Sequence, residues 1–193
     1  MLTHGRIEPE KRDLNVTKRG SSALVVFSGG QDSTTCLAWA LGEFKEVNAI
    51  SFNYRQRHGV ELESAKKIIS LLNQGEMQLE GVSWKGKIGH EIIDVGFLSD
   101  TLQTAMIQES EITHDEETGL PTTFVPGRNI FFLSIAAAVA YQRKVKHLVT
   151  GVCQTDYSDY PDCRDATIKS LQATLRLGLD YDVILLPPLV WNM

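Results

Sequence analysis

Residues 23–33 read ALVVFSGGQDS, and this stretch decides the fold. Its five apolar residues, bounded by small polar ones, predict a strand that is buried on both faces of a parallel sheet. Apolar residues at helical spacing after Ser33 predict a helix directly behind it. The two glycines between strand and helix allow a tight turn that brings backbone N–H groups close to an anion.

The turn therefore predicts a phosphate-binding loop at a helix N-terminus, where the helix dipole adds partial positive charge. Ser28 and Ser33 are expected to donate their hydroxyls to the same phosphate oxygens. The alternative is an ordinary strand-to-helix turn in which Asp32 or Ser33 caps the helix.

The alternation of strands and helices continues along the chain. We expect further strands at 47–52, 92–95, 147–150 and 183–186, and helices from 33 to a stop at Gly42, over 65–72, over 128–143, and from 168 to a stop at Gly178. The helix over 128–143 is apolar nearly all round, so we expect it deep in the protein. This pattern predicts an α/β fold, an open and mostly parallel sheet with helices on both faces and right-handed crossovers.

Ligands of such sheets bind beyond the carboxyl ends of the strands. Polar clusters fall there at residues 28–33, 53–58 and 152–164. Residues 81–87, GVSWKGK, have the spacing of the common P-loop, but Ile88 stands where a Ser or Thr must reach magnesium. We do not expect phosphate binding at 81–87.

Composition narrows the classes of function. The 193 residues include 19 Lys and Arg against 24 Asp and Glu, and the net charge of −5 has the wrong sign for a general nucleic-acid binder. The longest apolar stretch, 130–140, is too short to span a bilayer. Three widely spaced cysteines favour a reducing, cytoplasmic setting and show no zinc-ligand spacing. We expect a flexible leader over residues 1–22 and one domain over 23–193.

Two further segments carry charged groups that suit a nucleotide. Residues 53–58 include Arg57, and the alternative for them is a solvated basic loop. Arg128 opens the most apolar helix, where a bound anion would partner its charge. The alternative is that Asn129 caps this helix while Arg128 forms an ion pair.

The densest polar cluster covers residues 151–165. It contains four carboxylates, Asp156 and Asp162 among them, together with Arg164, which suits magnesium and a heterocycle edge. A loop in which Asp162 or Cys163 caps the following helix is the alternative. We expect Cys163 to be a structural thiol rather than a nucleophile.

The residues that carry a family resemblance are 27–37, Tyr54, 56–58, 123–129 and 151–164. Together they resemble the 7-cyano-7-deazaguanine synthase family of the PP-loop ATP pyrophosphatases, over residues 23 to about 191. The resemblance implies an adenine nucleotide α-hydrolase-like fold. It also implies a carbon–nitrogen ligase that converts 7-carboxy-7-deazaguanine and ammonia to 7-cyano-7-deazaguanine, in queuosine precursor biosynthesis, through an acyl adenylate.

The resemblance further implies which residues act. Those that would bind ATP are Phe27, Ser28, Gly29, Gly30, Gln31, Asp32, Ser33, Thr34, Thr35, Cys36 and Leu37, and the catalytic candidates are Asp32, Arg57, Arg128, Asp156, Asp162 and Arg164. Asp32 would help to place magnesium. One of the three arginines would neutralise charge at the pentavalent phosphorus. ATP and magnesium are the expected cofactors, small molecules the expected partners, and a homodimer the candidate assembly, with no direct nucleic-acid or membrane partner.

Three departures from the family pattern leave alternatives open. Arg55 stands where the family usually has Gly, and the stretch from Asn73 to Gly89 is longer than expected. The family usually continues into a segment with four zinc-binding cysteines, whereas this sequence stops at Met193. We therefore expect a truncated synthase without that zinc site. The alternatives are an ATP-binding remnant without full activity and another adenylating ligase of the superfamily.

Overall fold

A computed structural model describes residues 22–55, 60–82, 84–98, 125–153 and 160–191. Its strands are β1 (Ser22–Val26), β2 (Glu46–Asn53), β3 (Gly89–Asp94), β4 (His147–Thr150) and β5 (Ile184–Leu186). They form one parallel sheet in the order β3-β2-β1-β4-β5. The α/β fold with a parallel sheet is thus confirmed.

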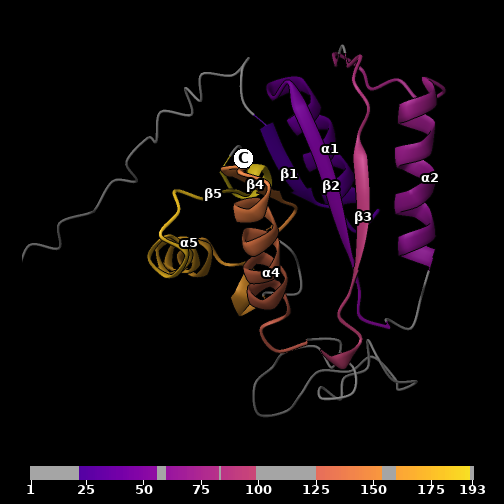
Figure 1. Cartoon of the computed structure of the whole chain (residues 1–193). Coiled ribbons are helices and arrows are strands. Elements are labelled where there is room, and N and C mark those ends of the chain that lie inside the picture. The colour runs from indigo at the N-terminus through magenta and orange to yellow at the C-terminus, as the bar shows by residue number, and fades with distance from the viewer. Residues whose placement is uncertain (1–21, 56–59, 83, 99–124, 154–159, 192–193) are drawn as a thin grey trace, which may run out of the picture.

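The helices lie on both faces of this sheet (Figure 1). They are α1 (Gln31–Glu43), α2 (Val60–Gln74), α4 (Arg128–Gln142), α5 (Asp165–Leu179) and the short α6 (Pro188–Trp191), with a 3₁₀ turn η1 (Pro161–Cys163) before α5. Side chains alternate along β1, so Ala23 and Val25 pack with α1 and α2 on one face, whereas Leu24 packs with α4 and α5 on the other.

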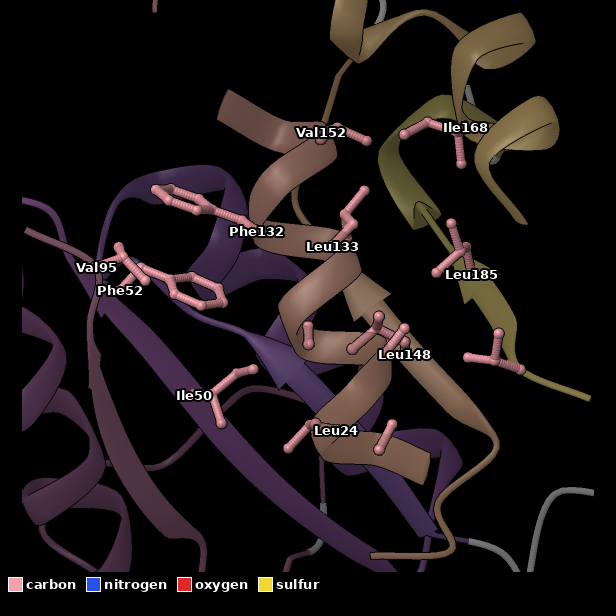
Figure 2. Close-up of a cluster of buried hydrophobic side chains, with 14 of the residues drawn as sticks. Leu24, Ile50, Phe52, Val95, Phe132, Leu133, Leu148, Val152, Ile168 and Leu185 are labelled. Carbon is pink, nitrogen blue, oxygen red and sulfur yellow. The ribbon is translucent and has the colours of Figure 1, made fainter. Parts of the chain in front are cut away.

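The core on the α4 side is shown in Figure 2. Leu24, Ile50 and Leu148 of the central strands meet Leu133 of α4. At the carboxyl end of the strands, the rings of Phe52 and Phe132 stack with centroids 4.4 Å apart. This packing ties α4 to the sheet.

The strand order fixes where a ligand can bind. The chain moves outward from β1 to β2 and β3, and then returns to place β4 on the other side of β1. The connections leaving β1 and β4 therefore diverge at one point, and this point at the carboxyl ends of the strands is the binding position of open α/β sheets.

Several expected helix boundaries were wrong. Gly42 and Gly178 lie inside α1 and α5, which end at Glu43 and Leu179. The chain leaves α5 through Asp180, whose φ of 46° gives the left-handed cap expected of glycine.

The expected burial of α4 was also wrong in part. Phe132, Leu133 and Ala136 are buried, but the other side of the helix exposes Phe131 by 46% and Tyr141 by 49%. In the part of the chain that the structure describes, no helix is long and apolar enough to cross a membrane. The predicted leader lies outside the described residues, apart from Ser22, which opens β1.

Candidate active site

The loop after β1 is organised around the Ser33 hydroxyl. Backbone N–H groups of Ser28 and Gly29 donate to Ser33 Oγ at 3.3 and 3.2 Å, and Ser33 Oγ donates to the Gly30 carbonyl at 3.0 Å. Ser28 Oγ lies 3.0 Å from Ser33 Oγ and accepts the Gly30 N–H at 3.2 Å. The loop is therefore held in shape by its own hydrogen bonds.

This network corrects one expectation. Ser33 is buried and its hydroxyl holds the loop together, so it does not point at a ligand as predicted. Gly30, not Asp32 or Ser33, is the N-cap of α1, and it makes no side-chain cap. The groups left to face an anion are the exposed Ser28 hydroxyl and the first turn of α1, whose N–H groups have no partner within the helix.

The two glycines of the loop have different surroundings. A Cβ on Gly29 would lie 2.6 Å from the Ala65 nitrogen and the Glu61 carbonyl oxygen of α2, and Gly29 has a φ of +87°. Among the residues that the structure describes, a Cβ on Gly30 would meet only Ser28 Oγ, at 3.4 Å. Gly29 is therefore required by packing, whereas the space over Gly30 is open to a ligand.

Only part of the predicted nucleotide-binding segment can face a ligand. The side chains of Phe27, Cys36 and Leu37 belong to the core, with exposures of 0, 0 and 1%. Thr34 and Thr35 turn their hydroxyls back to carbonyls of Gly30 and Gln31, at 2.8 and 3.0 Å. Ser28–Ser33 remains as the segment that can contact phosphates.

Cys36 is a structural thiol. Its Sγ donates to the Thr150 carbonyl at 3.5 Å, and burial, reinforced by the charge of Asp32, raises its pKa to about 12. A Cβ on Gly151 would lie 2.9 Å from the Ser33 nitrogen. The first turn of α1 thus rests directly on the end of β4, at the point where the connections diverge.

Arg128 is brought to the end of β2. It is the first residue of α4, and its side chain hydrogen-bonds the phenol of Tyr54, which follows β2. Burial raises the pKa of Tyr54, against the lowering effect of Arg128. The phenol is therefore neutral at physiological pH and does not neutralise the positive charge of Arg128.

Asp162 caps α4 rather than α5. Its buried carboxylate accepts the Asn129 N–H at 2.9 Å through Oδ2. Asn129 Nδ2 in turn donates to Cys163 Sγ at 3.3 Å. The expectation that Cys163 is structural fits this contact, and Asp162 joins η1 to the N-terminus of α4.

The remaining site candidates are spread more widely. Asp32 is exposed in the first turn of α1, and Arg164 is the exposed N-cap of α5. Arg57 and Asp156 lie outside the described residues. The structure thus gathers the loop, Arg128 and Asp162 at the carboxyl side of the sheet.

Arg55 adopts the backbone conformation that favours glycine. Its φ is 57°, and its N–H donates to Asn53 Oδ1 at 3.2 Å. The departure from the family pattern at this position therefore puts a side chain on a left-handed residue. The segment excluded as a P-loop leads into β3, whereas a P-loop leads into a helix.

Sequence reasoning missed one polar pair beside the loop. Ser51 of β2 hydrogen-bonds the Phe27 carbonyl and lies 2.7 Å from Nε2 of His90 on β3. The available signal was a serine between Ile50 and Phe52, in an otherwise apolar strand. Among the described residues, no group of three or more potential ligands gathers that could hold a metal ion.

The chain matches a known protein family and proteins that belong to it. The family model described as queuosine biosynthesis protein QueC matches residues 22–193. The 7-cyano-7-deazaguanine synthase of Gluconobacter oxydans is 50% identical over 177 residues, 91% of this chain and 71% of the relative. That of Halorhodospira halophila is 50% identical over 171 residues, 88% of this chain and 67% of the relative.

A solved structure of looser likeness is a predicted subunit of a tRNA methyltransferase from Methanocaldococcus jannaschii. Its sequence identity is 16% and its TM-score 0.48, over 88% of this chain and 68% of that one. The family match and the two close relatives cover nearly the whole chain. Because the family model matches residues 22–193 and both relatives are 50% identical to this chain, the chain belongs to the QueC family of 7-cyano-7-deazaguanine synthases.

Proposed function

We propose that this chain converts 7-carboxy-7-deazaguanine and ammonia to 7-cyano-7-deazaguanine with ATP bound over Ser28–Ser33. The observation that carries the ATP site is the open space at Gly30, beside the first turn of α1. Among the described residues, no packing contact requires glycine there. A phosphate that approaches the backbone does require it.

The reaction begins at the carboxylate of the substrate. Its oxygen attacks the α-phosphorus of ATP, pyrophosphate leaves, and an acyl adenylate forms. Ammonia then attacks the acyl carbon, AMP leaves, and the loss of a proton gives the amide. A second ATP activates the amide oxygen in the same way, and elimination of AMP with a proton yields the nitrile.

The residues of this chain are suited to the charge changes in these steps. The first turn of α1 offers N–H groups to the departing pyrophosphate. Arg128, held by Tyr54 at the end of β2, offers a fixed cation to the negative charge that develops at the α-phosphorus. Because Asp162 holds the N-terminus of α4, it positions Arg128 relative to η1.

Asp32, an exposed carboxylate in the first turn of α1, is the residue of this segment that would hold magnesium. When bound, magnesium would neutralise part of the triphosphate charge. A homodimer and a cytoplasmic location belong to the same proposal. The exposed Phe131 and Tyr141 of α4 offer apolar surface for a second copy.

The test is pyrophosphate release that depends on 7-carboxy-7-deazaguanine. We expect release with this substrate and none without it, followed by nitrile formation when ammonia is added. Release with a different carboxylic acid would favour another adenylating ligase. ATP binding without release on any deazapurine would favour a nucleotide-binding remnant.

Gly30→Val locates the ATP site. A valine fits the backbone angles of Gly30, φ −77° and ψ 170°, so the protein should fold, but its methyl groups would fill the space over the loop. We expect binding of ATP to be lost in isothermal titration. Gly42→Ala, in the same helix but 12 positions along the chain, is the matched control and should bind ATP normally.

A further inference from the structure

A buried polar pair supports the loop from the adjacent strands. Ser51 on β2 is 1% exposed, and its hydroxyl donates to the carbonyl of Phe27, the residue before Ser28. His90 on β3 is partly buried, and its Nε2 lies 2.7 Å from Ser51 Oγ. The two residues come from different strands and meet beneath the loop.

The protons in this pair can be assigned from the partners. A backbone carbonyl only accepts hydrogen bonds, so the Ser51 proton goes to Phe27. Ser51 Oγ must then accept from His90, which requires the hydrogen of the neutral imidazole on Nε2. Hydrogen bonds therefore run from His90 on β3 through Ser51 on β2 to the carbonyl of Phe27, which follows β1.

The Phe27–Ser28 peptide is consequently held from both sides. Its carbonyl is fixed by Ser51, and its N–H donates to Ser33 Oγ at 3.3 Å. The Phe27 N–H also donates to the Ile50 carbonyl at 2.8 Å. A rotation of this peptide would carry Gly29 and Gly30 with it, so its orientation sets the direction of the loop.

Two other roles for the pair do not fit these contacts. A nucleophilic serine must reach a substrate, whereas Ser51 is buried and has its proton on a carbonyl. A residue that only fills the core would be apolar, because a buried hydroxyl and imidazole must be hydrogen-bonded to offset their desolvation. The hydrogen bonds of this pair end on the loop.

We propose that His90 and Ser51 are positioning residues for ATP, which align the phosphate loop through the Phe27 carbonyl. The proposal rests on the proposed function, since it takes Ser28–Ser33 to be the ATP site. It adds that the edge strand β3, whose His90 ring lies edge-on to the Phe27 ring with centroids 6.2 Å apart, contributes to ATP affinity.

The experiment compares His90 with a histidine on the other side of β1. His147 is the matched control, because it is also partly buried and its Nδ1 lies 3.2 Å from the Ser22 carbonyl, at the start of β1. The variants are His90→Leu, His90→Gln, Ser51→Ala and His147→Leu. Binding of a nonhydrolysable ATP analogue and of 7-carboxy-7-deazaguanine is measured for each by titration calorimetry, with thermal melting as the check on folding.

We expect His90→Leu and Ser51→Ala to weaken binding of the ATP analogue about tenfold, which corresponds to about 1.4 kcal/mol. Affinity for 7-carboxy-7-deazaguanine should not change. His90→Gln keeps a side-chain donor and should recover most of the loss, and the Ser51→Ala/His90→Leu double variant should bind no more weakly than Ser51→Ala alone. His147→Leu should lower the melting temperature without changing ATP affinity.

Unchanged analogue affinity in His90→Leu overturns the proposal, as does an equal loss in His147→Leu. If Ser51→Ala does not fold, the comparison of His90→Leu with His90→Gln tests the proposal. Failure of His90→Gln to recover ATP-analogue binding would then overturn it. A wild-type protein that binds no ATP analogue overturns the proposed function itself, and the two failures are therefore distinguished by the wild-type titration.

Discussion

The glycines at the carboxyl end of the sheet differ from those in the last turns of α1 and α5. A Cβ on Gly29 or Gly151 would lie within 3 Å of backbone atoms of another element. Within the described parts of the chain, a Cβ on Gly178 would meet nothing within 4 Å, and one on Gly42 only a Val82 methyl group at 4.0 Å. At the carboxyl end, glycine lets backbones approach each other, whereas in the helices it is only a local weakness.

The largest effect that follows from this difference is at Gly29. Gly29→Ala puts a methyl group 2.6 Å from the backbone of α2 and forces alanine to a φ of +87°. Overpacking and left-handed strain together should lower the free energy of unfolding by about 3 kcal/mol or more. Urea unfolding followed by circular dichroism measures it.

A stability close to that of wild type in Gly29→Ala would break the comparison, because it would mean that α2 can move away from the loop at little cost. Gly30→Ala is the control in the neighbouring residue. Its Cβ would lie 3.4 Å from Ser28 Oγ, so its unfolding free energy should change by less than about 1 kcal/mol.

The side chain of Asp162 joins η1 to α4 at the carboxyl end of the sheet. Asp162→Ala removes the carboxylate that accepts the Asn129 N–H at 2.9 Å, and leaves the N-terminus of α4 without this cap. We expect a loss of about 2 kcal/mol in chemical denaturation. Asp162→Asn keeps an acceptor oxygen and should lose less. If Asp162→Asn folds as wild type but releases no pyrophosphate, Asp162 acts in the chemistry as well as in the cap.

The fold could be predicted because it depends on local patterns. Apolar runs such as Ala23–Phe27 and His147–Thr150 mark strands buried on both faces, and their alternation with helices leaves few topologies. The strand, the turn and the helix around Gly29 and Gly30 could be predicted for the same reason, since they are contiguous in the chain, and phosphate binding at this turn stays a prediction.

What could not be predicted depends on contacts between distant elements. The ends of α1 and α5 were also missed, since the helices run past Gly42 and Gly178 and end before the buried Phe44 and the left-handed Asp180. The apolar composition of α4 does not show which side of the helix is exposed to solvent. The bond of Asp162 to Asn129 and that of Ser51 to His90 join residues 33 and 39 positions apart, and no spacing rule covers them.

The histidines on either side of β1 should respond alike to acid, with a smaller effect than the loss of the cap. Burial lowers the pKa of His90 near the loop and of His147 at the start of the strands, from an ordinary value of 6.5. The unfolded chain therefore binds more protons than the native state just below pH 6.5. Stability should be full above that pH and fall as the pH decreases toward the lowered values.

Denaturation midpoints measured at several values between pH 7.5 and 5, about the range in which histidine titrates, test this response. His90→Leu and His147→Leu should each flatten the dependence on pH. If both variants show the same dependence of stability on pH as the wild type, carboxylates rather than these histidines cause the response.

The smallest effect is expected to have the opposite sign. Gly178→Ala adds a methyl group in the last turn of α5, where nothing lies within 4 Å of its Cβ. Since alanine loses less conformational entropy than glycine in a helix, the variant should be more stable by about 0.5–1 kcal/mol in urea unfolding. ATP affinity should not change, because a Cβ on Gly178 contacts none of the described residues. A destabilised Gly178→Ala would mean that this helix end needs glycine after all, and the contrast with Gly29 would then be one of degree.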